Sequence, residues 1–391
     1  MKKFMTIILA AALVFAFAGQ ASAAALETSG EYRGRFWYLD NYSQVPAEQD
    51  SQEFWDQRLR LNMNWKVTDT VKVGARADIL ENVWNTAADS QEIDFDWAYV
   101  QFMWGQVQTT VGKQDVSWGP GVYAKADNRY RFKVGTKFGE IPVGFAYDKL
   151  GESGGKFNED DHGYPQNTNI PVGGWNLGVL GIYRDNNPID ADFLAIDVTA
   201  AGAIGPAKIS FEGAYGQGDF GSLDQDGLMA YAGAFLPLGP VNCGFEFGYA
   251  KGDGSATDDE KKDALFHDYN GPFNSFILFN NFDLDGWNTT YTGGADKGLN
   301  NAMALKASAT FAFSKQLSLM GAAVWAQADE KGLRGSDDMG IEFDALLKYA
   351  ASENLTLQTG FGYLAAGDYY DVAGKSPDDP MVITAHAVVA F

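Results

Sequence analysis

The 391-residue sequence has one cysteine, three histidines and, beyond its first two dozen residues, no apolar run as long as a membrane-spanning helix requires, which is about 20 residues. Because Cys243 is the only cysteine, the chain forms no internal disulfide and must rely on backbone hydrogen bonds and packing. The sequence also lacks the G-x-S-x-G, H-E-x-x-H and P-loop patterns. We therefore expect neither an enzyme nor a metal or cofactor site.

Positive charge is scarce as well. The chain has 29 Lys and Arg against 51 Asp and Glu, and its formal net charge of −22 argues against a nucleic-acid partner. Proline is sparse at 12 residues, whereas glycine is abundant at 45 and 14% of the residues are aromatic. Abundant aromatic residues and glycines without long helical patterns favour an all-β protein with many turns.

The first 23 residues have the organisation of a secretory signal peptide. Met1-Lys2-Lys3 is positively charged, residues 4–18 are apolar, and Ala21-Ser22-Ala23 matches a small-residue cleavage site. We expect residues 1–23 to be removed and residues 24–391 to form one exported domain.

The segment 56–79 shows the pattern that recurs along the rest of the chain. Arg58 and Arg60 alternate with Leu59 and Leu61, and the alternation resumes after a polar turn. Side chains of a β-strand point alternately to opposite faces, so this segment predicts an antiparallel hairpin with one apolar and one charged face. Each strand runs for about ten residues or more, which is the length of a transmembrane strand rather than of a typical soluble one.

Seventeen such alternating segments are recognisable, and their connections alternate between short turns and long polar loops. This asymmetry is typical of outer-membrane barrels, whose strand number is even. We therefore predict a closed antiparallel transmembrane β-barrel of 18 strands, with 16 as the alternative, and place the unrecognised strand near 156–164. Short turns are assigned to the periplasm. The long extracellular loops are predicted at 39–52, 84–90, 115–126, 150–172, 217–226, 252–297, 328–338 and 367–379.

Alternation also predicts which side chains line the lumen. A basic ladder is expected from Arg33, Arg35, Arg58, Arg60, Arg76, Arg129, Arg131 and Lys133, with Glu31, Asp78, Asp94 and Asp96 on the same surface. The later strands look plainer, with Ser210, Glu212, Asn242, Glu246, Lys306, Ser308, Thr310, Thr356 and Gln358 facing inward. A wall rich in guanidinium groups would favour anions. The alternative is that the arginines pair with lumen carboxylates and only fill the barrel.

Two loops are candidates for narrowing the pore. The first is a compact turn with a bulky ring, formed by Trp118, Gly119, Pro120, Gly121 and Tyr123, which either folds inward as a constriction or stays on the surface. The second is the loop 252–297, whose apolar patch includes Phe273 and residues 276–279 and either plugs the mouth or packs on a neighbouring subunit. The run 281–286 resembles half of a calcium loop, but Thr292 stands where a bidentate Glu is needed.

The triplet Gly112-Lys113-Gln114, a Gly-rich loop and then Arg129-x-Arg131 resemble the pattern of porins related to the alginate-export barrel. Lys113 departs from that pattern, in which the triplet is usually Gly-Arg-Gln. The resemblance implies an 18-stranded channel with an electropositive lumen. General porins of this size are often homotrimers, whereas the alginate exporter is a monomer, so a trimer is only slightly favoured.

The chain ends in Phe391, which looks like the C-terminal signal read by the barrel-assembly machinery. Together these features predict a passive diffusion porin, embedded in the lipid of a Gram-negative outer membrane, for small hydrophilic and mainly anionic solutes. The alternatives are a specific channel for an anionic sugar or polysaccharide, and a structural barrel that sheathes a partner protein.

Overall fold

The structure is a computed structural model, and it describes residues 25–41, 51–84, 93–122, 127–151, 161–187, 190–220, 223–252, 273–279, 299, 301–332, 334–371, 376 and 378–391. Strands dominate these ranges, and a helical turn is formed by Asp368–Tyr370. Among the described residues, no helix is long and apolar enough to cross a membrane.

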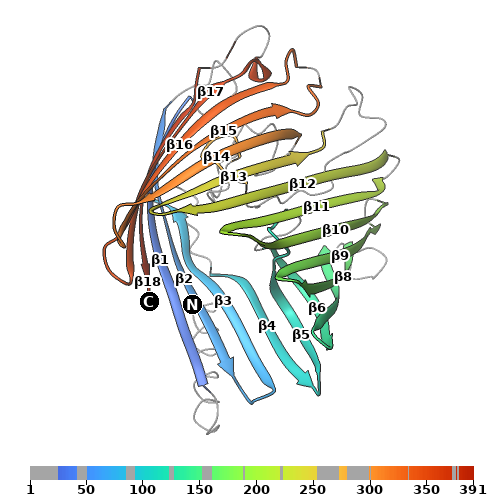
Figure 1. Cartoon of the computed structure of the whole chain (residues 1–391). Coiled ribbons are helices and arrows are strands. Elements are labelled where there is room, and N and C mark those ends of the chain that lie inside the picture. The colour runs from blue at the N-terminus through green and yellow to red at the C-terminus, as the bar shows by residue number, and fades with distance from the viewer. Residues whose placement is uncertain are drawn as a thin grey trace.

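Eighteen antiparallel strands form one closed barrel (Figure 1). Each strand pairs with its neighbours in the chain, and β1 also pairs with β18, from Glu31 opposite Ala390 to Asp40 opposite Met381. Closure leaves no unpaired sheet edge in the wall. The strands are β1 Ala25–Asp40, β2 Gln52–Lys66, β3 Val71–Val83, β4 Asp94–Trp104, β5 Val107–Val116, β6 Asp127–Phe138, β7 Ile141–Gly151, β8 Asp161–Val172, β9 Trp175–Asn186, β10 Ala191–Ile204, β11 Ala207–Phe220, β12 Leu223–Leu238, β13 Val241–Ala250, β14 Ala302–Ala312, β15 Leu317–Ala328, β16 Asp338–Ala350, β17 Leu355–Ala366 and β18 Met381–Ala390.

The predicted number of 18 strands is confirmed, and the alternative of 16 is wrong. The strand that the alternation left unrecognised is β8, which begins at Asp161 and so overlaps only the end of the predicted range 156–164. It occupies much of the predicted loop 150–172. Two prolines, Pro165 and Pro171, lie within it, and proline is otherwise rare inside a sheet because it donates no ladder hydrogen bond.

At one end of the barrel, short turns connect neighbouring strands. Several are two residues long and place a glycine in the left-handed region, as at Gly105, where φ is 60°, and Gly139, where φ is 63°. Longer turns use a hydroxyl instead: Thr68 Oγ1 accepts from Val71 N at 3.0 Å, and Ser314 Oγ accepts from Leu317 N at 3.0 Å. These local side-chain bonds satisfy backbone donors that the ladder leaves at the strand ends.

The opposite end carries the longer connections, with one correction. The predicted long loop 217–226 is wrong, because the ladder between β11 and β12 continues to the pair Phe220–Leu223. Gly216, Gly218 and several acidic residues give this stretch the composition of a loop, yet its backbone hydrogen bonds continue the hairpin. The connection between β9 and β10 is also short, so the asymmetry between the two ends is a tendency rather than a strict rule.

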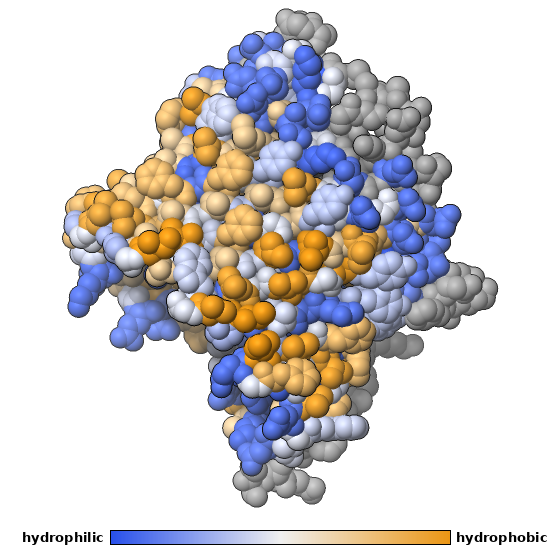
Figure 2. All heavy atoms as spheres, turned by 45° about the vertical axis from the view of Figure 1, so that its right-hand side comes forward, coloured by the Kyte–Doolittle hydropathy of each residue, from blue (hydrophilic) through white to orange (hydrophobic). Residues whose placement is uncertain are grey.

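The outer face of the barrel is apolar. In Figure 2 hydrophobic side chains form a band across this face, with hydrophilic ones above and below it. Apolar side chains exposed around the barrel include Phe132, Leu194, Phe211, Phe245 and Phe343, all more than one third exposed. Exposed aromatic rings such as Trp104, Phe138 and Phe313 lie at the short-turn end, as in an interfacial girdle.

The buried core lies inside the barrel rather than between two sheets. Its larger cluster combines inward side chains of the wall, such as Trp37 and Tyr231, with residues of the segment 273–279. The lumen is therefore partly filled by the protein's own chain, which makes it the place to look for function.

Candidate functional site

The predicted basic ladder lies on the inner wall formed by β1, β2, β3 and β6, and most of its members are paired with carboxylates. Arg35 Nε donates to both oxygens of Asp56, at 2.8 and 3.0 Å, and both residues are buried. Arg60 donates to Asp78 through two hydrogen bonds of 2.7 and 2.6 Å. The remaining pairs on these strands are Arg60 and Arg76 with Asp96, Arg58 with Glu31 and Glu81, and Arg33 with Glu81.

A second group of the ladder surrounds Asp148 on β7. This carboxylate is fully buried, and Arg131 binds it in a two-pronged arrangement that includes a bond of 2.6 Å from Nη2 to Oδ2. Arg129 lies 3.5 Å from the same carboxylate. Lys133 follows on the inward side of β6, opposite Thr110.

Sequence reasoning missed several of the ladder's partners. Extending the same alternation places Asp56 and Asp148 inward as well, whereas Glu81 lies beyond a shift in the β2–β3 register, so strict alternation would place it on the outer face. Asp94, a predicted member of the lumen surface, lies opposite Asp78 but is exposed at the start of β4. The ladder's eight cations face six carboxylates, namely Glu31, Asp56, Asp78, Glu81, Asp96 and Asp148, so the positive field is much weaker than the arginines alone would give.

The loop after β5 folds into the lumen and docks on the far wall. Trp118 Nε1 donates to Asp197 Oδ1 on β10 at 2.8 Å. The backbone N–H groups of Gly121 and Val122 both donate to Glu212 Oε2 on β11, at 2.8 and 2.9 Å. Tyr123, the last residue of the predicted constriction, lies outside the described residues.

The docked loop fits its wall closely. Gly119 has φ of +51°, and a Cβ atom there would lie 2.4 Å from Thr199 Cγ2, so only glycine fits. Trp118 is 8% exposed and packs in a cluster with inward side chains of β9 and β10, namely Leu180, Ile182, Phe193 and Ala195. Burial of this ring adds apolar contact to the hydrogen bonds that fix the loop.

The segment 273–279 of the long loop is docked in the same manner. Ser275 Oγ and the backbone N–H groups of Ile277 and Leu278 all donate to the carboxylate of Glu342 on β16, each at 2.7 Å. Phe273 and residues 276–279 are at most 1% exposed. These residues therefore plug part of the lumen, and do not form a patch for a neighbouring subunit. The calcium candidate 281–292 lies outside the described residues.

Glu212 and Glu342 thus each hold an inward loop on the wall, and we call them the loop anchors. Each is a fully buried carboxylate on the wall that accepts from two consecutive backbone N–H groups of an inward loop. A second acid lies near each anchor in the wall: Asp197 is bound to the same loop as Glu212, and Asp344 is two residues from Glu342. The later strands are therefore not the plain wall predicted from the sequence, because they carry this row of buried acids.

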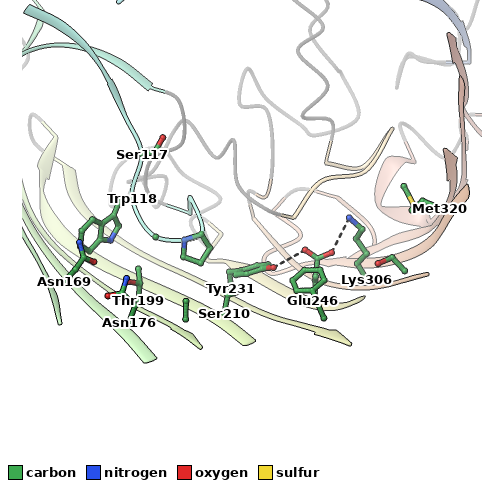
Figure 3. A pocket seen from close by; sticks show the side chains of 15 residues that line it. Ser117, Trp118, Asn169, Asn176, Thr199, Ser210, Tyr231, Glu246, Lys306 and Met320 are labelled. Carbon is green, nitrogen blue, oxygen red and sulfur yellow. Dashed lines mark hydrogen bonds and ion pairs between the residues drawn. The ribbon is translucent and has the colours of Figure 1, made fainter. Parts of the chain in front are cut away.

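A cavity of about 650 Å³ lies between the docked loop and the inner wall from β8 to β15 (Figure 3). Trp118 and Pro120 of the loop border it on one side. Across it, Tyr231 Oη donates to Glu246 Oε1 at 3.1 Å, and Lys306 Nζ lies 3.4 Å from Glu246 Oε2 (Figure 3). Among the described residues, no cluster of three or more His, Cys, Asp or Glu side chains is arranged to hold a metal ion.

No family model matches the sequence, and no curated protein sequence matches it. Solved structures do match the fold. OccK11 (OpdR) of Pseudomonas aeruginosa matches with a TM-score of 0.61 and 11% identity, covering 94% of this chain and 96% of that one. The outer membrane protein OpdK of the same organism matches with a TM-score of 0.60 and 10% identity, covering 94% of this chain and 99% of that one. OccK2 (OpdF) of Pseudomonas aeruginosa in complex with glucuronate matches with a TM-score of 0.59 and 11% identity, covering 93% of this chain and 98% of that one. At such low identity the likeness concerns the fold.

Proposed function

We propose that this protein is a porin of a Gram-negative outer membrane, through which small hydrophilic solutes diffuse passively. The observation that carries the proposal is the closed 18-stranded wall, apolar outside and polar inside, with loops docked in its lumen. Only a closed barrel lets strands cross lipid with every backbone group paired. The likeness in fold to OpdK, an outer membrane protein, and the signal peptide expected at 1–23 support the same location.

The solute class follows from the charges of the lumen. On β1–β7 the cations of the ladder outnumber the carboxylates paired with them, whereas β10–β16 carry the buried acids Asp197, Glu212, Glu246, Glu342 and Asp344, so a transverse field crosses the passage. We propose that the basic ladder gives a modest preference for anions, since most of its members are already paired. Because the structure of OccK2 holds glucuronate, this sugar acid is the first anion to test.

Planar-bilayer recording tests the proposal directly. A porin gives stepwise conductance that rises in proportion to salt, and proteoliposomes containing it swell in isotonic solutions of small sugars. Block by one oligosaccharide would instead support a substrate-specific channel. Silence at every salt concentration and voltage would contradict the porin and favour a barrel that sheathes a partner.

Two finer predictions from the sequence remain proposals, and one alternative is disfavoured. A homotrimer is tested by the mobility of the unboiled protein on a denaturing gel. Recognition of Phe391 by the barrel-assembly machinery is tested by the surface yield of Phe391→Ala. Transport of an alginate-like polymer is disfavoured by the buried segment 273–279, because a docked plug leaves less room for a polymer than for a small solute.

A further inference from the structure

The cavity beneath the docked loop has the size and lining of a binding site. Its volume of about 650 Å³ falls within the usual range for small-molecule sites, which is roughly 300–1,000 Å³. It reaches from the docked loop toward the short-turn end, because Asn176 comes just after the turn that begins β9. Every solute that passes the docked loop on this side of the lumen meets these residues.

The polar groups of the lining are mostly uncharged. Asn169 and Asn176 contribute amides, and Thr199, Ser210 and Ser308 contribute hydroxyls. Each of these groups both donates and accepts hydrogen bonds. Trp118 and Tyr231 add aromatic surface to the same lining (Figure 3).

The charged side chains of the lining are Glu246 and Lys306, and they are engaged with each other. Glu246 also accepts from Tyr231, and Lys306 Nζ also donates to the backbone carbonyl of Asn274 at 2.8 Å. Glu246 is 6% exposed. A carboxylate ligand would have to displace these partners, so the cavity does not offer a ready anion site.

Neutral sugars have the complementary chemistry. A pyranose ring presents a rim of hydroxyl groups that both donate and accept, and an apolar C–H face that packs on aromatic surface. We propose that this cavity is a subsite for uncharged polyhydroxylated solutes of mono- to disaccharide size. This inference rests on the proposed channel function, and it differs from the weak anion preference, which arises on the ladder of β1–β6.

The test compares block of single-channel current by sucrose, by glucuronate and by a polyethylene glycol of similar size. We expect sucrose to lower the current more than the polymer, and glucuronate to block no more tightly than sucrose. In the double variant Asn169→Leu/Asn176→Leu, the half-blocking sucrose concentration should rise about tenfold, because two hydrogen bonds are lost. The control Gln358→Leu removes an inward amide outside the cavity and should leave the half-blocking concentration unchanged.

Three outcomes would overturn the inference: sucrose and the polymer act alike, glucuronate binds more tightly than sucrose, or the double variant is blocked as readily as the parent. If the folded protein gives no conductance at all, the porin proposal fails by itself. Equilibrium dialysis of labelled sucrose against the detergent-solubilised barrel then decides the inference. Binding that weakens in the double variant supports it, and absence of binding overturns it.

Discussion

At the scale of single residues, the wall carboxylates hold the loops inside the barrel. The anchors Glu212 and Glu342 are fully buried, and each satisfies two backbone donors that would otherwise be unpaired. Charge-assisted bonds of this kind are stronger than neutral ones. A buried donor left without an acceptor costs about 1–3 kcal/mol, so loss of an anchor favours release of its loop.

The first prediction concerns Glu342. Replacing it with Ala removes the acceptor for Ser275, Ile277 and Leu278, so the segment 273–279 should leave the wall and the single-channel conductance should increase. Glu342→Gln keeps one acceptor oxygen and should give a smaller increase. Planar-bilayer recording measures both variants. If both conduct like the parent, the segment does not narrow the passage.

The second prediction concerns the buried carboxylate of Asp148. Arg131→Gln removes the two-pronged partner of this carboxylate and leaves the more distant cations Arg129 and Lys133, and breaking a buried pair typically costs about 3–5 kcal/mol. The double variant Arg131→Gln/Asp148→Asn should recover much of the loss, because no buried charge is then left unpaired. Urea unfolding in lipid vesicles, followed by tryptophan fluorescence, measures the free energy of unfolding. Equal stability of Arg131→Gln and the parent would contradict the role of this pair.

At the scale of elements, a feature can be predicted from the sequence when the residues that determine it are neighbours in the chain. Alternation of polar and apolar side chains is a property of each strand alone, so most strands and the inward direction of the ladder could be read from it. Strand β8 could not, because Pro165, Pro171 and its amides conceal a segment that pairing with β7 and β9 holds in the wall. The loop anchors could not be assigned either, since Glu342 meets its loop across 64 residues of sequence or more.

The third prediction tests β8 by cysteine labelling in a Cys243→Ala background. Register places Thr168 opposite the exposed Val143 and Asn167 opposite Gly144, so neighbouring residues face opposite sides. A cysteine at 168 should react with a lipid-soluble maleimide, and one at 167 or 169 with a water-soluble maleimide that enters the lumen. Equal labelling of residues 167 and 168 would place this stretch outside the wall.

At the scale of the whole molecule, the first and last strands complete the wall. Gly30 N donates to Phe391 O at 2.7 Å and Phe391 N donates to Gly30 O at 3.0 Å, so the last residue continues the seam between β1 and β18. A Cβ on Gly30 would lie 2.5 Å from the Phe391 ring, so this glycine provides the space for that ring. The seam joins residues more than 300 positions apart and can form only when the other strands are in place.

The fourth prediction concerns the net selectivity of the passage. Because paired carboxylates offset most of the ladder, the reversal potential in a potassium chloride gradient should indicate only a modest anion preference. Arg129→Gln should reduce this preference and still keep the stronger Arg131–Asp148 pair. Thr356→Val, an inward change without charge, is the matched control. A reversal potential unaffected by Arg129→Gln would show that the ladder does not set selectivity.

The anchors Glu212 and Glu342 recognise main-chain amides, and every amino acid except proline supplies the same donor. The anchors therefore demand nothing of the side chains at these positions beyond the exclusion of proline, and the demands that remain come from the positive φ of 104° at Gly121 and from the burial of Val122, Ile277 and Leu278. A different loop sequence would keep its anchor, and it would still need side chains that pack against the same wall residues.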